Sequence, residues 1–417
     1  MLSEKEAGMI SGDDVTCAFR VTTGLKIAKA AAAIAAEQST GTWTRVTTRS
    51  DAIDRKLAGR VLSTRKIADR DYIVIIEFPL ADFDPETGGV PQILSVVAGN
   101  LFGLDGLEGV RLEAMNIPAG IASTFPGPKF GAEGIYSRLR RKEGRPLLGT
   151  IVKPKIGLSP KATGNYVYRV GMGGLTNSKD DETLTDQKFC PLLERTRAIA
   201  EAIDRVRSES GHRMMHAINI STRPDRILEL ADRAISAGAT ELMVDVLTCG
   251  FPAVQILAED KSVTLPLHIH RTMHGALTRN PRHGISPGII AQLTRMCGGD
   301  ALHIGTFGIG KMHGDKTEDL RSQELLTEKF QGMAEVLPVC SGGVHPGLVP
   351  KILATAGATV QIQAGGGVSG HPQGLEAGAI AMNQAVDAFL QRKSLKKYSE
   401  DHKELGSALA KWGERCV

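Results

Sequence analysis

The chain has 417 residues, of which 42% are hydrophobic and 23% charged, and its net charge is +4. This length exceeds one ordinary hydrophobic core and predicts one large domain with a smaller one. Only 4% of the residues are aromatic and the sequence has no concentrated basic stripe, which argues against nucleic-acid binding; the mild positive charge suits an anionic small substrate.

The cysteines and the apolar runs indicate the compartment. The six cysteines are scattered without a CxxC pair, which is typical of a reduced protein with neither a disulfide framework nor a zinc site. The N-terminus, MLSEKEAGMISGDD, lacks the apolar region of a signal peptide, and no run approaches the ~18 apolar residues of a membrane span. We therefore expect a cytoplasmic protein that does not associate with membranes.

The first part of the chain, residues 1–125, mixes segments of two kinds. Some alternate apolar and polar residues as strands do, and others, such as the alanine-rich run IAKAAAAIAAEQS, have helical character. This mixture predicts a small α+β domain. Its expected strands are 14–21, 71–80 and 109–118, and its expected helices are 27–39 and 90–103.

The remainder, residues 126–417, has a regular pattern after a Pro/Gly-rich connection. Eight β-rich runs alternate with amphipathic helical stretches, which predicts a (β/α)8 barrel of the TIM type. A doubly wound open sheet is the alternative, but such sheets usually open with a G-x-G-x-x-G loop that is absent here. The expected strands are 146–154, 173–179, 215–221, 241–247, 265–270, 301–306, 336–343 and 359–367.

Reactive residues gather where these strands end. Functional side chains of a barrel lie at the C-terminal ends of its strands, and six of the eight expected strands lead directly into reactive or glycine-rich segments. In chain order these segments hold Lys153 and Lys155, then Lys179 to Glu182, then His268, His270, Arg271 and His274, then His303 and the loop to Lys311, then Ser341 to Gly343, and last Gly365 to Gly367.

The residue types at these ends indicate a chemistry. Asp181 and Glu182 offer the hard oxygen ligands that Mg²⁺ prefers. The planar guanidinium of Arg271 suits phosphate, and glycines after the last two strands form the usual phosphate site of a barrel. Mg²⁺ with basic lysines nearby can enolise a ketose. The residues alone therefore predict a Mg²⁺-dependent, enolate-forming enzyme that acts on a phosphorylated keto-sugar.

Each segment also has a simpler structural interpretation. The stretch from Lys179 to Glu182 reads as a solvated charged loop, because a protonated lysine cannot bind a cation. His268 and His270 share one face of a strand, so one of them is expected to support the other from the interior. The glycine runs could be tight turns, and the loop that carries Lys311 could be a flexible linker.

Several segments, in order along the chain, resemble the large chain of ribulose-1,5-bisphosphate carboxylase (Rubisco). They are GTIVKPKIGLSP, GGLTNSKDDET, LPLHIHRTMHGALTRNPRHGIS, LHIGTFGIGKMHGDK, PVCSGGVHPGL and IQAGGGVSGHPQG. AAEQSTGTWT and AGNLFG extend the resemblance into the N-terminal part, so that it covers nearly the whole chain. The phrases TRNPRHGIS, LTDQKF and HPGL resemble the archaeal form III branch.

The resemblance implies a carbon–carbon lyase that carboxylates ribulose 1,5-bisphosphate through an enediolate, giving two molecules of 3-phosphoglycerate. It implies Mg²⁺ as cofactor and CO2 as an activator that turns Lys179 into a carbamate. This carbamate would bind the metal together with Asp181 and Glu182. The catalytic residues would be Lys153, Lys179, His270 and Lys311.

The resemblance also implies where the substrate binds and how subunits assemble. Residues of the small domain in this family reach the active site of a neighbouring subunit, so we expect a homodimer or a larger assembly of dimers with shared sites. Those residues are Glu37, Thr42, Trp43 and Asn100. The other implied substrate-binding residues are Lys155, Arg271, His303, Ser341, Gly342, Gly343, Gly365 and Gly366.

Two other functions compete with carboxylation. Rubisco-like proteins share the fold but enolise, isomerise or decarboxylate other phosphorylated keto-sugars, and a non-catalytic scaffold would keep only the fold. Both would usually replace reactive residues that this chain retains. The chain departs from common family patterns at Ile151, at Met312 and in the loop from His303 to Lys311, which is one residue longer than in plant-type chains.

Overall fold

The computed structural model describes residues 3–10, 12–42, 44, 46–312 and 314–415. The chain forms two compact units: Met1–Pro126 with Met273–Met296, called here the N-terminal unit, and Gly127–Thr272 with Cys297–Val417, called the barrel unit. The predicted division after residue 125 had placed 273–296 with the barrel. In the structure this segment contains strand β10 (Gly284–Ile285), which pairs with β4 (Leu107–Met115) of the N-terminal unit.

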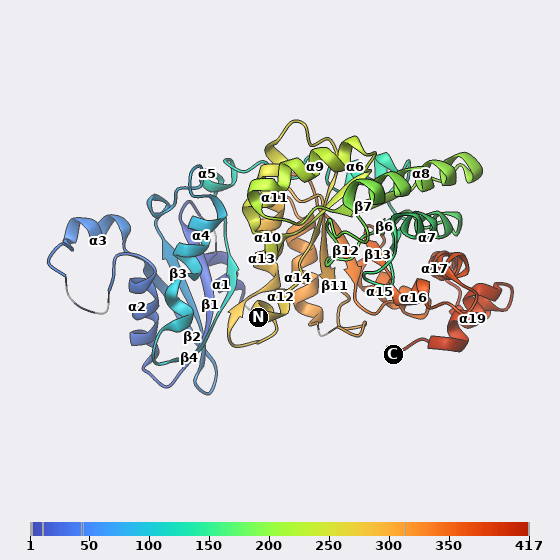
Figure 1. Ribbon diagram of the computed structural model, residues 1–417. Helices are drawn as coiled ribbons and strands as arrows, with labels where there is room; N and C mark the ends of the chain where they lie inside the picture. Colours follow the sequence, from blue (N-terminus) through green and yellow to red (C-terminus); the bar gives the residue numbers. More distant parts are fainter. Residues whose placement is uncertain (1–2, 11, 43, 45, 313, 416–417) are drawn as a thin grey trace. The chain divides into compact units, whose positions relative to one another are not determined.

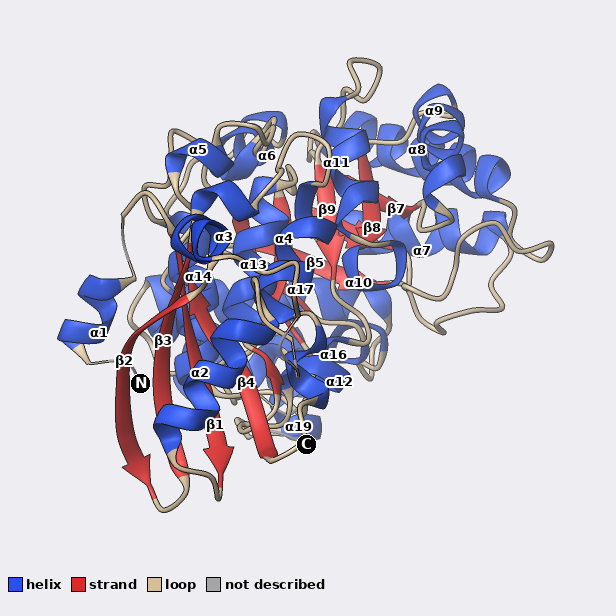
Figure 2. Ribbon diagram, turned by 90° about the vertical axis from the view of Figure 1, so that its left-hand side faces the viewer, coloured by secondary structure: helices blue, strands red, loops and turns tan. Residues whose placement is uncertain are grey.

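The N-terminal unit is built on a five-stranded sheet in the order β10-β4-β1-β3-β2, and helix α2 (Ile27–Glu37) lies across β2 and β3 (Figure 2). The expected strands correspond to β1 (Val15–Thr23), β3 (Asp71–Phe78) and β4. The expected helices correspond to α2 and α4 (Gly89–Ala98). The other helical segments are α1 (Glu4–Met9), α3 (Asp51–Leu57), α5 (Ala119–Ala122), α12 (His274–Thr278), α13 (Pro287–Met296), η1 (Leu80–Asp82) and η2 (Asn100–Gly103).

Strand β2 (Arg60–Ala68) was not predicted from the sequence. It lies at one edge of the sheet, and all of its residues are exposed or half-exposed. An edge strand without a buried face needs no alternation of apolar and polar residues, so the usual signal was missing.

The barrel unit confirms the predicted (β/α)8 fold. Eight parallel strands close in the order β5-β6-β7-β8-β9-β11-β12-β13, with β13 paired back to β5, and Figure 1 shows them inside a ring of helices. The strands are β5 (Leu147–Ile151), β6 (Asn177–Lys179), β7 (Met215–Asn219), β8 (Glu241–Asp245), β9 (Leu267–His270), β11 (Ala301–Gly305), β12 (Leu337–Ser341) and β13 (Gln361–Gln363).

Two helices of the barrel unit show a clear local signal at one end. Helix α7 starts at Pro160, where the Ser159 hydroxyl accepts from the backbone N–H of Ala162, and α8 ends before Gly211 in the left-handed conformation. The helical segments are α6 (Gly131–Arg138), α7 (Pro160–Met172), α8 (Leu192–Ser210), α9 (Ile227–Ser236), α10 (Val246–Cys249), α11 (Phe251–Glu259), α14 (Lys316–Thr327), α15 (Val349–Ala356), α16 (Gly366–Ser369), α17 (Leu375–Leu390), α18 (Leu395–Ser399), α19 (Lys403–Trp412), η3 (Pro224–Arg226) and η4 (Pro346–Leu348).

The barrel strands carry both apolar and polar buried side chains. Side chains of α6 pack on Leu147, Met215, Ala301 and other apolar residues of the strands, forming one core cluster. The strands also carry polar side chains that are at most 1% exposed, whereas branched apolar residues usually fill such a barrel. These polar residues are Asn177, Glu241, His268, Gln361 and Gln363.

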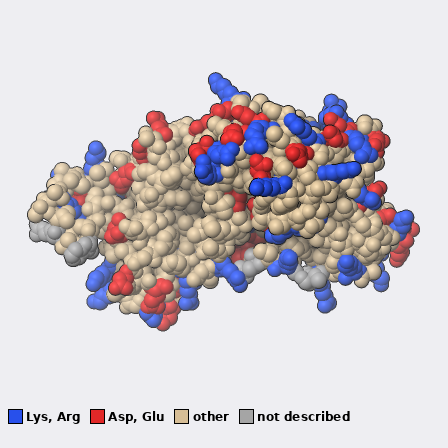
Figure 3. Space-filling model, in the orientation of Figure 1, with Lys and Arg blue, Asp and Glu red and all other residues tan. Residues whose placement is uncertain are grey.

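The surface of the barrel unit carries charges of both signs. On the face shown in Figure 3, Lys and Arg side chains are interspersed with Asp and Glu over the barrel unit. Among the helices of the described ranges, none is long and apolar enough to cross a membrane.

Candidate active site at the C-terminal ends of the barrel strands

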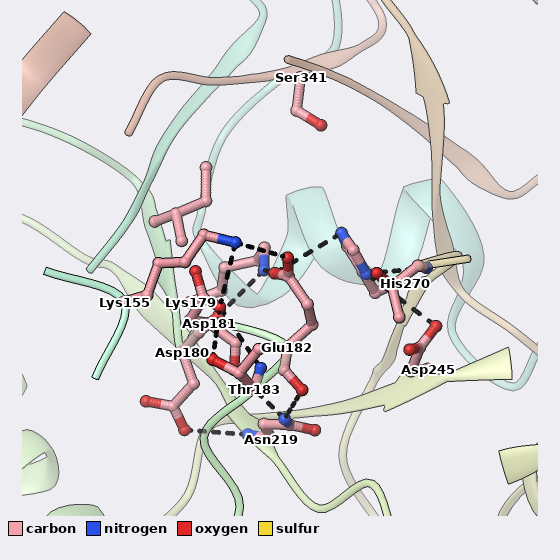
Figure 4. A network of polar contacts seen from close by, with 12 residues as sticks. Lys155, Lys179, Asp180, Asp181, Glu182, Thr183, Asn219, Asp245, His270 and Ser341 are labelled. Carbon is pink, nitrogen blue, oxygen red and sulfur yellow. Dashed lines mark hydrogen bonds and ion pairs between the residues drawn. The ribbon is translucent and has the colours of Figure 1, made fainter. Parts of the chain in front are cut away.

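Two lysines that follow β5 contact two acidic residues that follow β6. Lys153 Nζ lies 2.9 Å from Asp181 Oδ2, and Lys155 Nζ lies 3.5 Å from Glu182 Oε1. Because β5 and β6 are neighbouring parallel strands, their C-terminal ends bring these oppositely charged groups together. Figure 4 shows the lysine and carboxylate side chains converging.

Lys179, the last residue of β6, is buried beneath this cluster. Its side chain is 1% exposed, and its Nζ donates to Asp180 O at 2.9 Å and lies 3.7 Å from Glu182 Oε2. Burial lowers the pKa of Lys179 and the charge of Lys153 adds to this, while Glu182 and Asp181 oppose it. The amine is therefore more readily neutral than an ordinary lysine, and a neutral amine is a nucleophile.

The side chain of Asp180 points into a different network. Its carboxylate accepts from Arg195 Nε at 3.0 Å and from the backbone N–H of Asn219 at 3.0 Å, and it lies 3.2 Å from His216 Nε2. Asp180 and Arg195 are both fully buried. Asp180 thus ties β6 to α8 and β7, and only Asp181 and Glu182 of the acidic run face the lysines.

His270, the last residue of β9, faces Glu182 from the other side of the cluster (Figure 4). Its Nδ1 accepts from the backbone N–H of Thr272 at 3.2 Å, so in the neutral ring Nε2 carries the proton, and Nε2 lies 3.9 Å from Glu182 Oε2. Burial holds the pKa of His270 well below its usual range, and the charge of Lys179 lowers it further. The ring is therefore a neutral donor.

Two residues of this site were missed by the sequence analysis, and both end strands for which no reactive cluster was expected. Asn219 ends β7, and its Nδ2 donates to the carbonyl oxygens of Asp181 and Glu182 at 3.2 Å each. Asp245 ends β8, and its Oδ1 lies 4.0 Å from His270 Nδ1. Burial raises the pKa of Asp245 to about 6. In the sequence each is a polar residue that interrupts the apolar residues of an expected strand, and this was the available signal.

A second group of predicted residues lies on or directly after β9, β11 and β12. His303 Nδ1 and Ser341 Oγ are 2.6 Å apart, and the rings of His270 and His303 are edge to face with centroids 4.7 Å apart. Arg271 is 6% exposed; burial lowers its pKa, and the carboxylate of Asp319 opposes the shift. In Figure 4, Ser341 lies apart from the carboxylate cluster.

The glycine-rich turns pack against two of the predicted lysines. The backbone N–H of Lys311 donates to Gly342 O at 3.0 Å, and a Cβ on Gly343, which has φ +79°, would lie 2.4 Å from Lys311 Cγ. A Cβ on Gly365 would lie 3.0 Å from Lys153 Cε, whereas one on Gly366 would meet open space. Side chains at Gly343 and Gly365 would displace the lysines, so glycine keeps these turns narrow.

The substrate-binding residues expected from the small domain belong to the N-terminal unit. Glu37 is the last residue of α2 and is half-buried, while Thr42 and Asn100 are exposed. Trp43 lies outside the described residues. His274 also belongs to this unit, at the start of α12, where its Nδ1 lies 3.0 Å from Thr278 Oγ1.

The donor set beside Lys179 fits a hard divalent cation. Asp181 Oδ1 is held by the hydroxyl of Thr183 at 2.9 Å, which orients the carboxylate. Glu182 contacts its lysine and histidine neighbours only at 3.5 to 3.9 Å, so its carboxylate can turn toward a metal ion without breaking a short bond. Carboxylate oxygens are the ligands that Mg²⁺ prefers.

Comparison with known proteins shows which family the chain resembles. The model of the ribulose bisphosphate carboxylase large chain, catalytic domain, matches residues 134–412, and the model of its N-terminal domain matches residues 6–121. A ribulose bisphosphate carboxylase of Methanocaldococcus jannaschii is 39% identical over 96% of this chain and 97% of the relative. One of Pyrococcus furiosus is 39% identical over 94% and 92%.

Solved structures agree with these sequence matches. Octameric Rubisco from Pyrococcus horikoshii, in complex with sulfate, superposes with a TM-score of 0.90 at 36% identity, covering 97% of this chain and 94% of that one. Dimeric archaeal Rubisco from Hyperthermus butylicus gives a TM-score of 0.88 at 35% identity, covering 97% of each chain. The chain therefore belongs to the Rubisco large-chain family.

Proposed function

We propose that the chain is a Mg²⁺-dependent carboxylase that combines ribulose 1,5-bisphosphate, CO2 and water into two molecules of 3-phosphoglycerate through an enediolate. The observation that most supports this is the position of Lys179, a buried amine of lowered pKa beside Asp181 and Glu182. A neutral amine can attack CO2 and become a carbamate. This would add a third anionic ligand to two carboxylates that already fit Mg²⁺.

The residues around Lys179 have chemically suitable positions for the proposed reaction. Bound Mg²⁺ would polarise the substrate carbonyl. Lys153, held by Asp181 at 2.9 Å, would exchange protons at the reacting carbons, and His270 would assist hydration through the proton on Nε2. Lys311 would close over the substrate and orient the incoming CO2.

The two ends of the substrate would bind to different parts of the barrel mouth. Arg271, His303 and Ser341 would hold one phosphate and the sugar hydroxyls. The other phosphate would bind at the glycine turns that include Gly343, Gly365 and Gly366, whose backbone N–H groups carry no side chains of their own beside them. Thr42 and Trp43 would complete this second phosphate site.

The proposed enzyme is a homodimer or an assembly of dimers, because the structural relatives are a dimer and an octamer. In this arrangement Glu37, Thr42, Trp43 and Asn100 act in the site of the neighbouring subunit. Co-expression of Glu37→Gln subunits with Lys179→Met subunits tests this sharing. Mixed dimers should contain one intact site and recover activity that neither variant has alone; activity that stays at the level of the separate variants would contradict shared sites.

Product analysis tests the carboxylase proposal directly. The protein is incubated with Mg²⁺ and labelled bicarbonate, ribulose bisphosphate is added, and acid-stable label is measured in 3-phosphoglycerate. We expect label in wild type and none in Lys179→Arg, because a guanidinium cannot form the carbamate. Turnover of another phosphorylated keto-sugar without carboxylation would instead assign the chain to the Rubisco-like enzymes, and label incorporated by Lys179→Arg would refute the role of the carbamate.

A further inference from the structure

Four side chains form a continuous line through the barrel interior from β8 to β12. Glu241 Oε1 lies 3.5 Å from His268 Nδ1, His268 Nε2 lies 2.8 Å from His303 Nε2, and His303 Nδ1 lies 2.6 Å from Ser341 Oγ. Glu241 and His268 are fully buried and His303 is 4% exposed. The line connects the buried Glu241 to the proposed substrate site.

The two short contacts, His268–His303 and His303–Ser341, are hydrogen bonds whose donors and acceptors can be arranged in only two ways. Burial holds the pKa of His303 well below its usual range, and the neighbouring His270 lowers it further, so its ring is neutral and carries a single proton. If the proton is on His303 Nε2, it is donated to His268, and His303 Nδ1 must accept from the Ser341 hydroxyl. If the proton is on Nδ1, it is donated to Ser341 and the whole chain of hydrogen bonds reverses.

Glu241 is placed to decide between these directions. Within the described chain neither of its carboxylate oxygens has a hydrogen-bond partner, and neither has His268 Nδ1. A buried carboxylate is costly unless it is paired, and an ionised one can only accept. The arrangement that satisfies both groups has a proton on His268 Nδ1, shared with Glu241 directly or through one water. His268 Nε2 is then an acceptor.

We propose that Glu241 is a positioning residue that fixes the direction of the hydrogen-bond chain through His268 and His303, so that the Ser341 hydroxyl donates inward and presents only lone pairs to the substrate site. Ser341 then accepts from a donor group of the substrate, such as a sugar hydroxyl, and discriminates against a phosphate oxygen at that position. The consequence for the substrate rests on the proposed function; the hydrogen-bond direction does not.

The direction can be measured on the wild-type enzyme without substrate. Nitrogen-15 NMR of histidine-labelled full-length protein distinguishes protonated from unprotonated ring nitrogens, with His268 and His303 assigned from single-histidine substitutions. We expect protons on His268 Nδ1 and His303 Nε2. Protons on His268 Nε2 and His303 Nδ1, the pattern produced if Glu241 were itself the donor, would overturn the proposal.

Substitution of Glu241 tests its control of the chain. Glu241→Met removes the acceptor at similar volume and should shift the His303 proton toward Nδ1, whereas Gln361→Met should leave both histidines unchanged. Gln361 is equally buried, and its side-chain atoms have no hydrogen bond within the described part of the chain. An unchanged His303 signal in a folded Glu241→Met protein would contradict the proposal.

A double-mutant cycle connects the direction to catalysis. Glu241→Met should lower kcat/KM by about tenfold, the usual effect of one misdirected hydrogen bond, and Gln361→Met should not lower it. In a Ser341→Ala background Glu241→Met should have no further effect, because it acts only through Ser341. Equal losses in both backgrounds would show that Glu241 does not act through Ser341. If carboxylation itself is absent, the NMR result still decides the hydrogen-bond direction.

Discussion

Asp180 and Asp181 are consecutive residues, yet their side chains enter two different kinds of polar network. Asp180 is enclosed by Arg195, His216 and the backbone of Asn219, all at short distances, and has no access to solvent. Asp181 and Glu182 face lysines at the barrel mouth, and most of these contacts are long. The network of Asp180, called here the closed network, holds the strands together. The network of Asp181 and Glu182 with the lysines, called the open network, retains the freedom to bind a ligand.

The largest expected effect is loss of activity when one carboxylate, that of Asp181, is removed from the group of carboxylates and lysines at the barrel mouth. Asp181→Asn removes a charge proposed to bind Mg²⁺ and should lower carboxylase turnover by about a thousandfold or more, with little change in thermal unfolding. Turnover and unfolding temperature are measured together. Asp186→Asn, in the same loop but bonded to Leu192 N, serves as the control for charge loss and should retain most activity. Full activity in Asp181→Asn would remove it from the metal site.

The closed network should respond in the opposite manner. Asp180→Asn leaves the guanidinium of Arg195 buried without its carboxylate, which should cost about 3–5 kcal/mol in the free energy of unfolding. Urea denaturation measures this loss. The exposed pair Arg226–Glu229 provides the control, because water screens this pair and Glu229→Gln should lower the free energy of unfolding far less than Asp180→Asn does. Equal losses in the free energy of unfolding from Asp180→Asn and Glu229→Gln would show that the burial of Asp180 adds nothing to stability.

Asn219 lies between the two networks and allows a finer separation of their roles. Its side chain supports the carbonyls of Asp181 and Glu182, so Asn219→Ala should lower turnover by about 10–100-fold through misplaced carboxylates. Asn383→Ala is a close match, since Asn383 Nδ2 also donates to two carbonyls at 3.2 Å, those of Gly173 and Ala379. Both variants should lose similar stability, but only the first should lose turnover. An equal fall in turnover would point to a general loss of rigidity.

The smallest expected effect concerns the ion pair between Glu6 and Arg65 in the N-terminal unit. The guanidinium of Arg65 holds the pKa of Glu6 at about 2, against 4.5 in an unfolded chain. The ion pair therefore stabilises the fold fully above about pH 4.5, and this stabilisation is lost as the pH falls toward 2. Because Arg65 is 40% exposed, we expect Glu6→Gln to cost only ~1 kcal/mol at pH 7. Unfolding measured from pH 7 to 2 should show this difference shrinking; a constant difference would contradict the ion pair.

The sequence predicted most of the fold because the barrel strands are short apolar runs separated by amphipathic helices. It also predicted that Lys153, Asp181 and Glu182 would meet, since ends of neighbouring parallel strands must meet. It missed β10, whose two residues become a strand only through their pairing with β4. It missed Asn219 and Asp245, because a single polar residue at the end of an apolar run resembles an ordinary strand boundary.

Glu241 was missed for a different reason. It begins β8, inside the barrel, where sequence patterns predict apolar filling, and its significance depends on His268 and His303 from two other strands. No local pattern contains that relation. The roles of Lys179 and Lys311 came from the family resemblance, and the burial of Lys179 could be known only once the strands were arranged around it.

The pairing of β10 with β4 has a consequence for how the protein is made. Arg111 and Leu112 of β4 pair with Gly284 and Ile285, which leave the ribosome only after much of the barrel has been synthesised. Until then β4 presents an unpaired edge, the kind of surface on which chains aggregate. A truncated chain ending at Pro126 would keep that edge permanently open. The nascent chain therefore depends on a late segment to complete its first sheet.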